Sequence, residues 1–134
     1  QSIAYGLTDS PSGQAAWIYE KIQEWTDSDG DCEALLGRDA ILDNIMLYWL
    51  SASAGSSARL YWESFAKFVP TRLELPVGVS IFPKDIISPA RRWAEKLMTH
   101  IIHWNEVDRG GHFAAWEQPE LFVQELRQCF AALR

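Results

Sequence analysis

The second half of the chain alternates segments of strand character with segments of helix character, and this alternation limits the fold more than any other feature. "LPVGVSIFP" and "HIIHWNEV" are rich in β-branched residues, which favours two strands. "SPARRWAEKLM" and "QPELFVQELRQCFAALR" have helical spacing, with Pro89 and Pro119 at first-turn positions. The order strand, helix, strand, helix is typical of a parallel sheet flanked by helices. Residues 70–134 are therefore predicted to form an α/β structure.

The predicted sheet is incomplete if these are its only strands. Two parallel strands leave both edges unpaired and cannot bury both of their faces. The chain also begins with Gln1 rather than with Met. We therefore expect a fragment that carries the end of a larger sheet.

The first half of the chain has helical periodicity. After an irregular start, "DSPSGQAAWIYEKIQEWT" predicts a helix that begins near Ser10 or Ser12. "RDAILDNIMLYWL" predicts a second helix with Asp39 as its cap, and "SARLYWESFAKF" predicts a third. The polar "DSDGDCEALLG" and the small-residue "SASAGSS" are expected as connections. Residues 1–69 are thus predicted to be all helical and separate from residues 70–134.

Composition excludes several classes of partner. The 134 residues are 48% hydrophobic with a net charge of -6, which indicates a globular chain without the basic surface that nucleic acids or anionic membranes require. The longest apolar runs fall short of the ~18 residues that span a bilayer. Cys32 and Cys129 lie far apart and outside any CxxC pattern, so neither a disulfide framework nor a zinc site is predicted. Two unpaired thiols favour a reducing compartment, and we expect a soluble, cytoplasmic protein.

The segment "DRGGHFAAWEQPEL" puts His112 just beyond the second predicted strand. Reacting groups gather at the carboxyl edge of open α/β sheets, and Gly110 and Gly111 allow the backbone to turn sharply there. Histidine, with an ordinary pKa of about 6.5, can take and return a proton near neutral pH. His112 is therefore a candidate catalytic base. The structural alternative is that it caps the following turn.

A carboxylate follows the other predicted strand. In "VGVSIFPKD", Asp85 comes just past the strand end, which puts it on the same sheet edge as His112. A carboxylate there can accept the Nδ1 proton of the imidazole and stabilise the imidazolium. The alternatives are that Asp85 caps the next helix or is simply solvated. The sequence has no GxSxG elbow, so the group that such a pair would activate is not visible.

"DSDGD" does not meet the requirements of a calcium loop. Asp27, Asp29 and Asp31 alternate as calcium ligands do, but glycine comes one place early at Gly30. Arg38 stands where a bidentate glutamate is required. No metal site is predicted.

The remaining candidates have structural explanations. His100 and His103 flank "II" on a predicted strand and are expected to be structural rather than metal ligands. The aromatic residues of the first three helices could line a substrate tunnel, but most are expected in the core: Trp17, Trp25, Tyr48, Trp49 and Trp62.

Four blocks of the sequence together resemble the C-terminal part of an epoxide hydrolase. They are "LTDSPSGQAAWIYEKIQEWT", "LDNIMLYWLSASAGSSARLYWES", "LPVGVSIFPKDI" and "DRGGHFAAWEQPELF", and they occur in the family's order. The closer resemblance is to the microsomal-type branch of the α/β-hydrolase fold, in its bacterial form. It implies that residues 1–69 are a helical cap portion and residues 70–134 the C-terminal part of the hydrolase core.

The resemblance implies a two-step reaction, in which an aspartate opens the epoxide and water activated by histidine then hydrolyses the ester. His112 matches the histidine of the family's RGGHF motif. Asp85 matches the triad acid, which is commonly glutamate in animal members, and the separation 112 − 85 = 27 agrees with the family. Tyr61 matches one of two cap tyrosines that hold the epoxide oxygen, a task suited to a phenol donor. Without the resemblance, Tyr61 beside Trp62 would be assigned to the core.

The nucleophilic aspartate and second cap tyrosine of the family have no equivalents here, so the resemblance implies that they lie upstream. It further implies a small apolar epoxide as substrate, the remaining N-terminal part of the hydrolase as partner, and no cofactor. Two alternatives stay open. The missing nucleophile could serve haloalkanes or esters, or the chain could be a non-catalytic helical interaction module in which Asp85 and His112 are structural.

Overall fold

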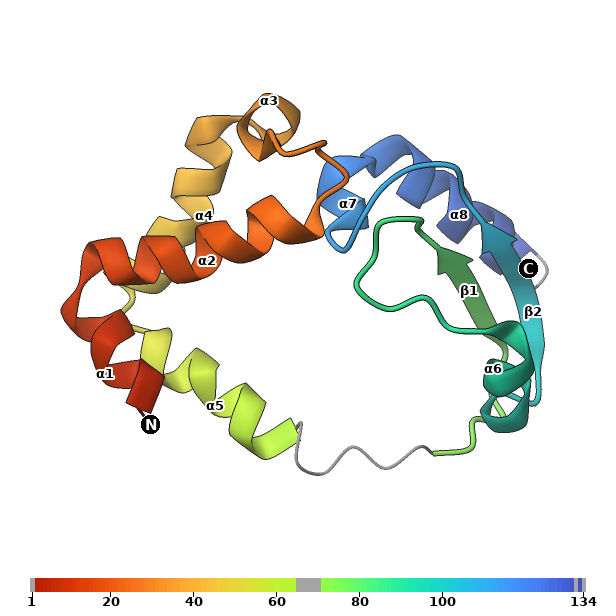
Figure 1. Cartoon of the computed structure of the whole chain (residues 1–134). Helices are drawn as coiled ribbons and strands as arrows, with labels where there is room; N and C mark the ends of the chain where they lie inside the picture. The colour runs from red at the N-terminus through yellow and green to blue at the C-terminus, as the bar shows by residue number, and fades with distance from the viewer. Residues whose placement is uncertain (1, 65–70, 132, 134) are drawn as a thin grey trace. The chain divides into compact units, whose positions relative to one another are not determined.

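The computed structural model describes residues 2–64, 71–131 and 133 (Figure 1). Its contacts divide the chain into two compact units. The first comprises Gln1–Glu24 and Ser28–Val69, and the second comprises Trp25–Asp27 and Pro70–Arg134. The short segment Trp25–Asp27 therefore belongs with the second half of the chain, although Trp25 is the last residue of the first half's longest helix.

The first unit is built from helices, as the sequence predicts. They are α1 (Ser2–Asp9), α2 (Pro11–Trp25), α3 (Cys32–Leu36), α4 (Arg38–Leu50) and α5 (Ala54–Ser64). Helix α2 begins where expected, because Ser10 Oγ accepts a hydrogen bond from the Gly13 backbone N–H at 3.1 Å. Helix α1 packs against α5. The interior is small, and its most deeply buried side chains are Gln14, Ile22, Cys32, Ile41 and Ala54.

Three details of the first unit differ from the sequence prediction. The start of the chain is helical rather than irregular, and the segment predicted as a loop contains α3. Asp31 starts that helix by accepting a hydrogen bond from Ala34 N at 3.0 Å. Asp39 is not the cap of α4; that position is held by Gly37, whose φ of 83° suits glycine, and Asp39 lies in the first turn.

Helix α5 begins earlier than predicted. Its first turn uses the small residues that were expected as a break, because Ser57 Oγ donates to Ala54 O at 2.9 Å within the helix. Helix α1 lies beside Gly55, where a Cβ would make an ordinary van der Waals contact of 3.6 Å with the Cβ of Ala4. The predicted continuation from residue 65 to residue 68 lies outside the described residues.

The second unit confirms the predicted α/β order. Strands β1 (Val77–Ile81) and β2 (Ile101–Glu106) are parallel neighbours, and α6 (Arg91–Leu97) connects them. Helix α8 (Pro119–Ala131) begins at Pro119 as predicted and contacts both strands, as Figure 1 shows. The sequence missed the one-turn helix α7 (Ala114–Glu117). Pro89 was predicted in the first turn of α6 but lies outside the helix, because the N-cap is Ala90.

The contact between α8 and the strands is close and partly polar. A Cβ on Gly78 of β1 would overlap Sγ of Cys129, so glycine is required under the helix. Glu125, 3% exposed, reaches the strands by hydrogen bonds to Ser80, His103 and Asn105. Strand β1, although rich in apolar residues, is not buried in this segment, because its residues are half-exposed or exposed.

The described helices are short of what a membrane crossing requires. None of those within residues 2–64, 71–131 and 133 is both long and apolar enough to span a bilayer.

Candidate active site

The ends of β1 and β2 bring Asp85 and His112 together. Beyond the last strand pair, Ile81 with Glu106, the two segments pair again at an isolated parallel bridge between Lys84 and Gly111, three residues after Ile81 and five after Glu106. Lys84 N donates to Gly110 O at 3.1 Å within this bridge. Asp85 directly follows Lys84, and His112 directly follows Gly111. One backbone bridge therefore holds both residues at the carboxyl edge of the sheet.

The two side chains form a direct hydrogen bond. Nδ1 of His112 lies 2.9 Å from Oδ1 of Asp85, and the side chains are 36% and 31% exposed respectively. Aspartate, although it is shorter than glutamate, therefore reaches the imidazole. Nδ1 donates to the carboxylate, which leaves Nε2 as the basic nitrogen. Such a pair can take a proton at Nε2 while the carboxylate stabilises the resulting imidazolium.

The capping alternatives for these two residues do not hold. Helix α6 has Ala90 as its N-cap and no side-chain capping bond, so Asp85 does not cap it. Helix α7 has Phe113 as its N-cap, again without a side-chain bond, so His112 does not cap the turn. Besides His112, Asp85 Oδ1 accepts only a long contact of 3.4 Å from Ile87 N among the hydrogen bonds of the described residues.

Two aromatic rings contact the imidazole. The ring of Trp25 meets that of His112 edge to face, with centroids 5.2 Å apart and planes at 81°. Phe113 makes a similar contact, at 5.2 Å and 76°. These edge-to-face contacts limit rotation of the imidazole about its side-chain bonds.

Sequence reasoning missed two carboxylates that bind the turn carrying His112. Glu117, 6% exposed, accepts hydrogen bonds from Gly111 N and Phe113 N, both at 2.9 Å. Asp27 accepts one from Gly110 N at 2.8 Å through Oδ2. Asp27 is 83 residues away from Gly110 in sequence, so no local pattern could have indicated this pairing.

Tyr61, the third predicted site residue, belongs to the first unit. It lies on α5, 43% exposed, with its ring edge to face with Trp17 at a centroid distance of 6.2 Å. Asp85 and His112 are thus brought together in the second unit, and Tyr61 is described within the first.

The aromatic residues of the helical unit are not core residues, contrary to the sequence expectation. Trp62 is 82% exposed and Tyr48 is 36% exposed. Three others are only half-buried in this segment: Trp17, Trp25 and Trp49. A chain of this length offers too little partner surface to cover them.

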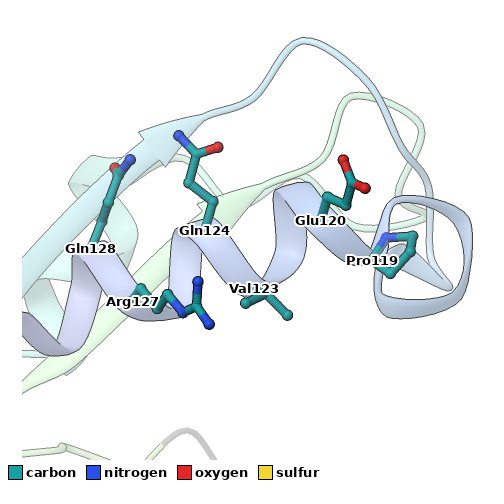
Figure 2. Close-up of a pocket in the computed structure, with 6 residues that line it drawn as sticks. All are labelled: Pro119, Glu120, Val123, Gln124, Arg127 and Gln128. Atoms are coloured by element: carbon teal, nitrogen blue, oxygen red, sulfur yellow. The ribbon is translucent and has the colours of Figure 1, made fainter.

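The other candidate groups do not form a second site within the described residues. No group of three or more His, Cys, Asp or Glu side chains within the described residues is arranged to hold a metal ion. His103 is engaged by Glu125, with Nε2 2.8 Å from Oε2. A surface hollow follows one side of α8 (Figure 2) and contains none of the predicted site residues. Its lining is partly polar and partly apolar and consists of Pro119, Glu120, Val123, Gln124, Arg127 and Gln128.

Known proteins with similar sequences are named epoxide hydrolases. A protein of Stigmatella aurantiaca (strain DW4/3-1), named "Putative epoxide hydrolase", is 58% identical over 100% of this chain and 31% of its own length. "Epoxide hydrolase 1" of Sus scrofa is 33% identical over 98% of this chain and 32% of its own length. The chain therefore spans about a third of the length of the curated relatives that it matches. No protein-family model matches the chain.

Solved structures of epoxide hydrolases have the same fold over this segment. The juvenile hormone epoxide hydrolase of the silkworm Bombyx mori superposes with a TM-score of 0.87 at 30% identity, over 97% of this chain and 36% of that protein. An enantioselective mutant of the Aspergillus niger epoxide hydrolase superposes with a TM-score of 0.82, also at 30% identity, over 98% and 33%. The chain belongs to the epoxide hydrolase family and has the fold of the C-terminal segment of its α/β-hydrolase architecture.

Proposed function

We propose that the protein containing this chain hydrolyses epoxides to vicinal diols through a covalent aspartyl ester. The observation that carries the proposal is the 2.9 Å hydrogen bond between His112 Nδ1 and Asp85 Oδ1 at the carboxyl edge of the sheet. The relatives named epoxide hydrolase, which match the chain over its whole length, support the choice of substrate class. The substrate is a small apolar epoxide.

In the first step, a carboxylate of an aspartate outside residues 1–134 attacks an epoxide carbon. The C–O bond of the ring breaks, and the ester forms with an alkoxide beside it. Tyr61 donates a hydrogen bond and then a proton to that oxygen, because a phenol is a strong enough donor to stabilise the developing charge. The exposure of the Tyr61 side chain, 43%, leaves it accessible to a substrate.

In the second step, His112 acts as the general base. Nε2 takes a proton from water as the water oxygen attacks the ester carbonyl carbon, and the acyl–oxygen bond then breaks. The departing alkoxide takes the proton from Nε2 of His112, which completes the diol. The carboxylic acid left on the aspartate returns its proton to the Tyr61 phenolate, so that the aspartate, Tyr61 and His112 are all in their starting states. Asp85 holds Nδ1 protonated and stabilises the imidazolium, so no metal or other cofactor is required for this sequence of steps.

We assign residues 1–69 to the helical cap and residues 70–134 to the end of the hydrolase core. The cap residue is Tyr61 and the core residues are Asp85 and His112. The rest of the hydrolase is the partner of this segment. We also propose a cytoplasmic location, since Cys32 and Cys129 are both free and buried, as is usual in reducing compartments.

Replacement of Tyr61 separates an epoxide hydrolase from a hydrolase of esters or haloalkanes. In the complete enzyme, Tyr61→Phe should slow ester formation from an epoxide by about 10²-fold, because one donor to the leaving oxygen is lost. Tyr48→Phe is the matched control, since Tyr48 is also an exposed helical tyrosine of the first unit. Stopped-flow measurement of the first turnover gives this rate. An unchanged rate in Tyr61→Phe would remove both the role of Tyr61 and the epoxide assignment based on it.

A further inference from the structure

Four consecutive backbone N–H groups around the proposed base have defined acceptors. Gly110 N donates to Asp27 Oδ2 at 2.8 Å, and His112 N donates to the carbonyl of Trp25 at 2.8 Å. Gly111 N and Phe113 N, on either side of His112, both donate to the carboxylate of Glu117 at 2.9 Å. The backbone of this glycine-rich turn is thus fixed although its sequence is flexible.

Glu117 also holds the segment on which the other acceptors lie. Its Oε2 accepts a hydrogen bond from Asp27 N at 2.8 Å, in addition to the one from Gly111 N. One carboxylate that is 6% exposed therefore joins residues 25–27 to the turn of His112. A buried carboxylate with three backbone donors is strongly bound, because charge-assisted hydrogen bonds strengthen away from water.

The two segments are packed too tightly for a side chain at Gly111. A Cβ there would lie 2.5 Å from the carbonyl oxygen of Trp25 and 3.0 Å from Asp27 N, and both of these are backbone atoms. The same segment supplies the Trp25 ring that contacts the imidazole at 5.2 Å. The position of residues 25–27 consequently decides both where the His112 backbone lies and which way its ring faces.

We propose that Glu117 and Asp27 are positioning residues for His112, acting on the ester-hydrolysis step and not on ester formation. This inference rests on the proposed function, in which His112 is the base of the second step. Loss of a backbone bond lets the turn shift, and a shift of about 1 Å at a catalytic base can slow its step by about 10²-fold. The first step uses the nucleophile and the cap tyrosine, so it is unaffected.

The test measures the two steps separately in the complete enzyme. Glu117→Gln has nearly the same shape but replaces one acceptor oxygen with an NH₂ group that faces a backbone N–H. Rapid mixing with an epoxide, followed by quenching and mass spectrometry of the enzyme, gives the rates of ester formation and ester hydrolysis. We expect ester formation within about twofold of wild type and ester hydrolysis slower by tenfold to a hundredfold, on the order expected for a displaced base. Glu120→Gln, an exposed change of the same kind, is the control and should alter neither rate.

Asp27→Ala provides a second variant should Glu117→Gln not fold. It removes only the acceptor of Gly110 N at a partly exposed position, and it should also slow hydrolysis alone, by a smaller factor. The positioning role is wrong if a folded Glu117→Gln or Asp27→Ala variant has the same ratio of ester-hydrolysis rate to ester-formation rate as Glu120→Gln. It is also wrong if both rates fall by the same factor.

His112→Gln in the same assay separates this inference from the proposed function. Slow hydrolysis in His112→Gln with normal hydrolysis in Glu117→Gln would overturn the positioning role alone. Normal hydrolysis in His112→Gln would overturn the proposed function itself, and the positioning role with it.

Discussion

At the scale of single residues, the geometry at the sheet edge follows from a second point of pairing beyond the strands. Strands β1 and β2 pair as far as Ile81 and Glu106, and the bridge between Lys84 and Gly111 pairs the two segments again, three residues further along one and five along the other. Asp85 and His112 follow it directly, with the hydrogen bond of 2.9 Å as the result. A short acid is sufficient here because the backbone already brings the two residues together.

Asp85→Asn should slow ester hydrolysis by about 10²-fold or more in the complete enzyme. The amide removes the negative charge that stabilises the imidazolium and favours the correct tautomer. Ester formation should stay near its wild-type rate. Asp108→Asn is the control, since Asp108 is exposed and forms an ion pair with the neighbouring Arg109. Rate constants from quenched single turnovers check this, and equal hydrolysis rates in the two variants would contradict the role of Asp85.

The sequence was sufficient to find Asp85 and His112 but not the residues that hold them. Both lie just past predicted strands, where a general rule for α/β sheets directs attention. Glu117 comes just before the predicted last helix, and Asp27 is separated from it by 90 residues. Their partners are backbone N–H groups, which carry no residue identity, so only the three-dimensional structure reveals these bonds.

At the scale of secondary-structure elements, long periodic segments were predicted well and single turns were missed. Helices α2 and α8 carry helical periodicity, α4 is a long apolar segment, and strands β1 and β2 are rich in β-branched residues. Helices α3 and α7 have 5 and 4 residues, too few for a pattern to appear, and they depend on local bonds such as the one from Ala34 N to Asp31.

The contact of α8 with the strands should make stability depend on pH. Burial raises the pKa of Glu125, but hydrogen bonds from His103, Ser80 and Asn105 outweigh it and lower the pKa below the ordinary 4.5. A lowered carboxyl pKa stabilises the fold above the ordinary value, and this contribution is lost as the pH falls through the lowered folded-state value. The complete enzyme should therefore lose stability on acidification below about pH 4.5.

Glu125→Gln should remove that dependence. Gln keeps one acceptor for the three donors, so the variant should be less stable by about 1–3 kcal/mol at pH 6, with the difference closing as the pH falls. The Tm of both proteins between pH 6 and pH 3 measures this, with Glu120→Gln as a control on the same helix. A difference that stays constant over this range would refute the assignment to Glu125.

At the scale of the whole molecule, the segment exposes apolar surface that a complete hydrolase would cover. Trp62, Leu50 and Leu75 are 82%, 76% and 72% exposed, and both strands have an open edge in the two-stranded sheet. The aromatic residues expected in the core are exposed for the same reason. Composition could indicate how much apolar surface the chain has. It could not indicate that residues outside this segment are needed to cover that surface.

Residues 1–134 produced alone should therefore be inactive and poorly packed. We expect no diol formation, because the segment has no nucleophilic aspartate equivalent to that of the family, and we expect strong binding of an apolar dye. Near-ultraviolet circular dichroism and dye fluorescence measure the packing, with the complete enzyme as reference. A cooperative unfolding transition together with epoxide turnover by the isolated segment would contradict this expectation.

The proposed mechanism depends most on His112 as the base for hydrolysis of the ester. Trapping that ester is the most direct test of this role. The complete enzyme with His112→Gln is mixed with a slight excess of epoxide, quenched, and its mass measured over time. We predict that the enzyme gains the mass of one epoxide at a near wild-type rate and keeps it, with no diol released. Diol release at the wild-type rate, or the absence of any mass gain in a folded variant, would contradict the mechanism.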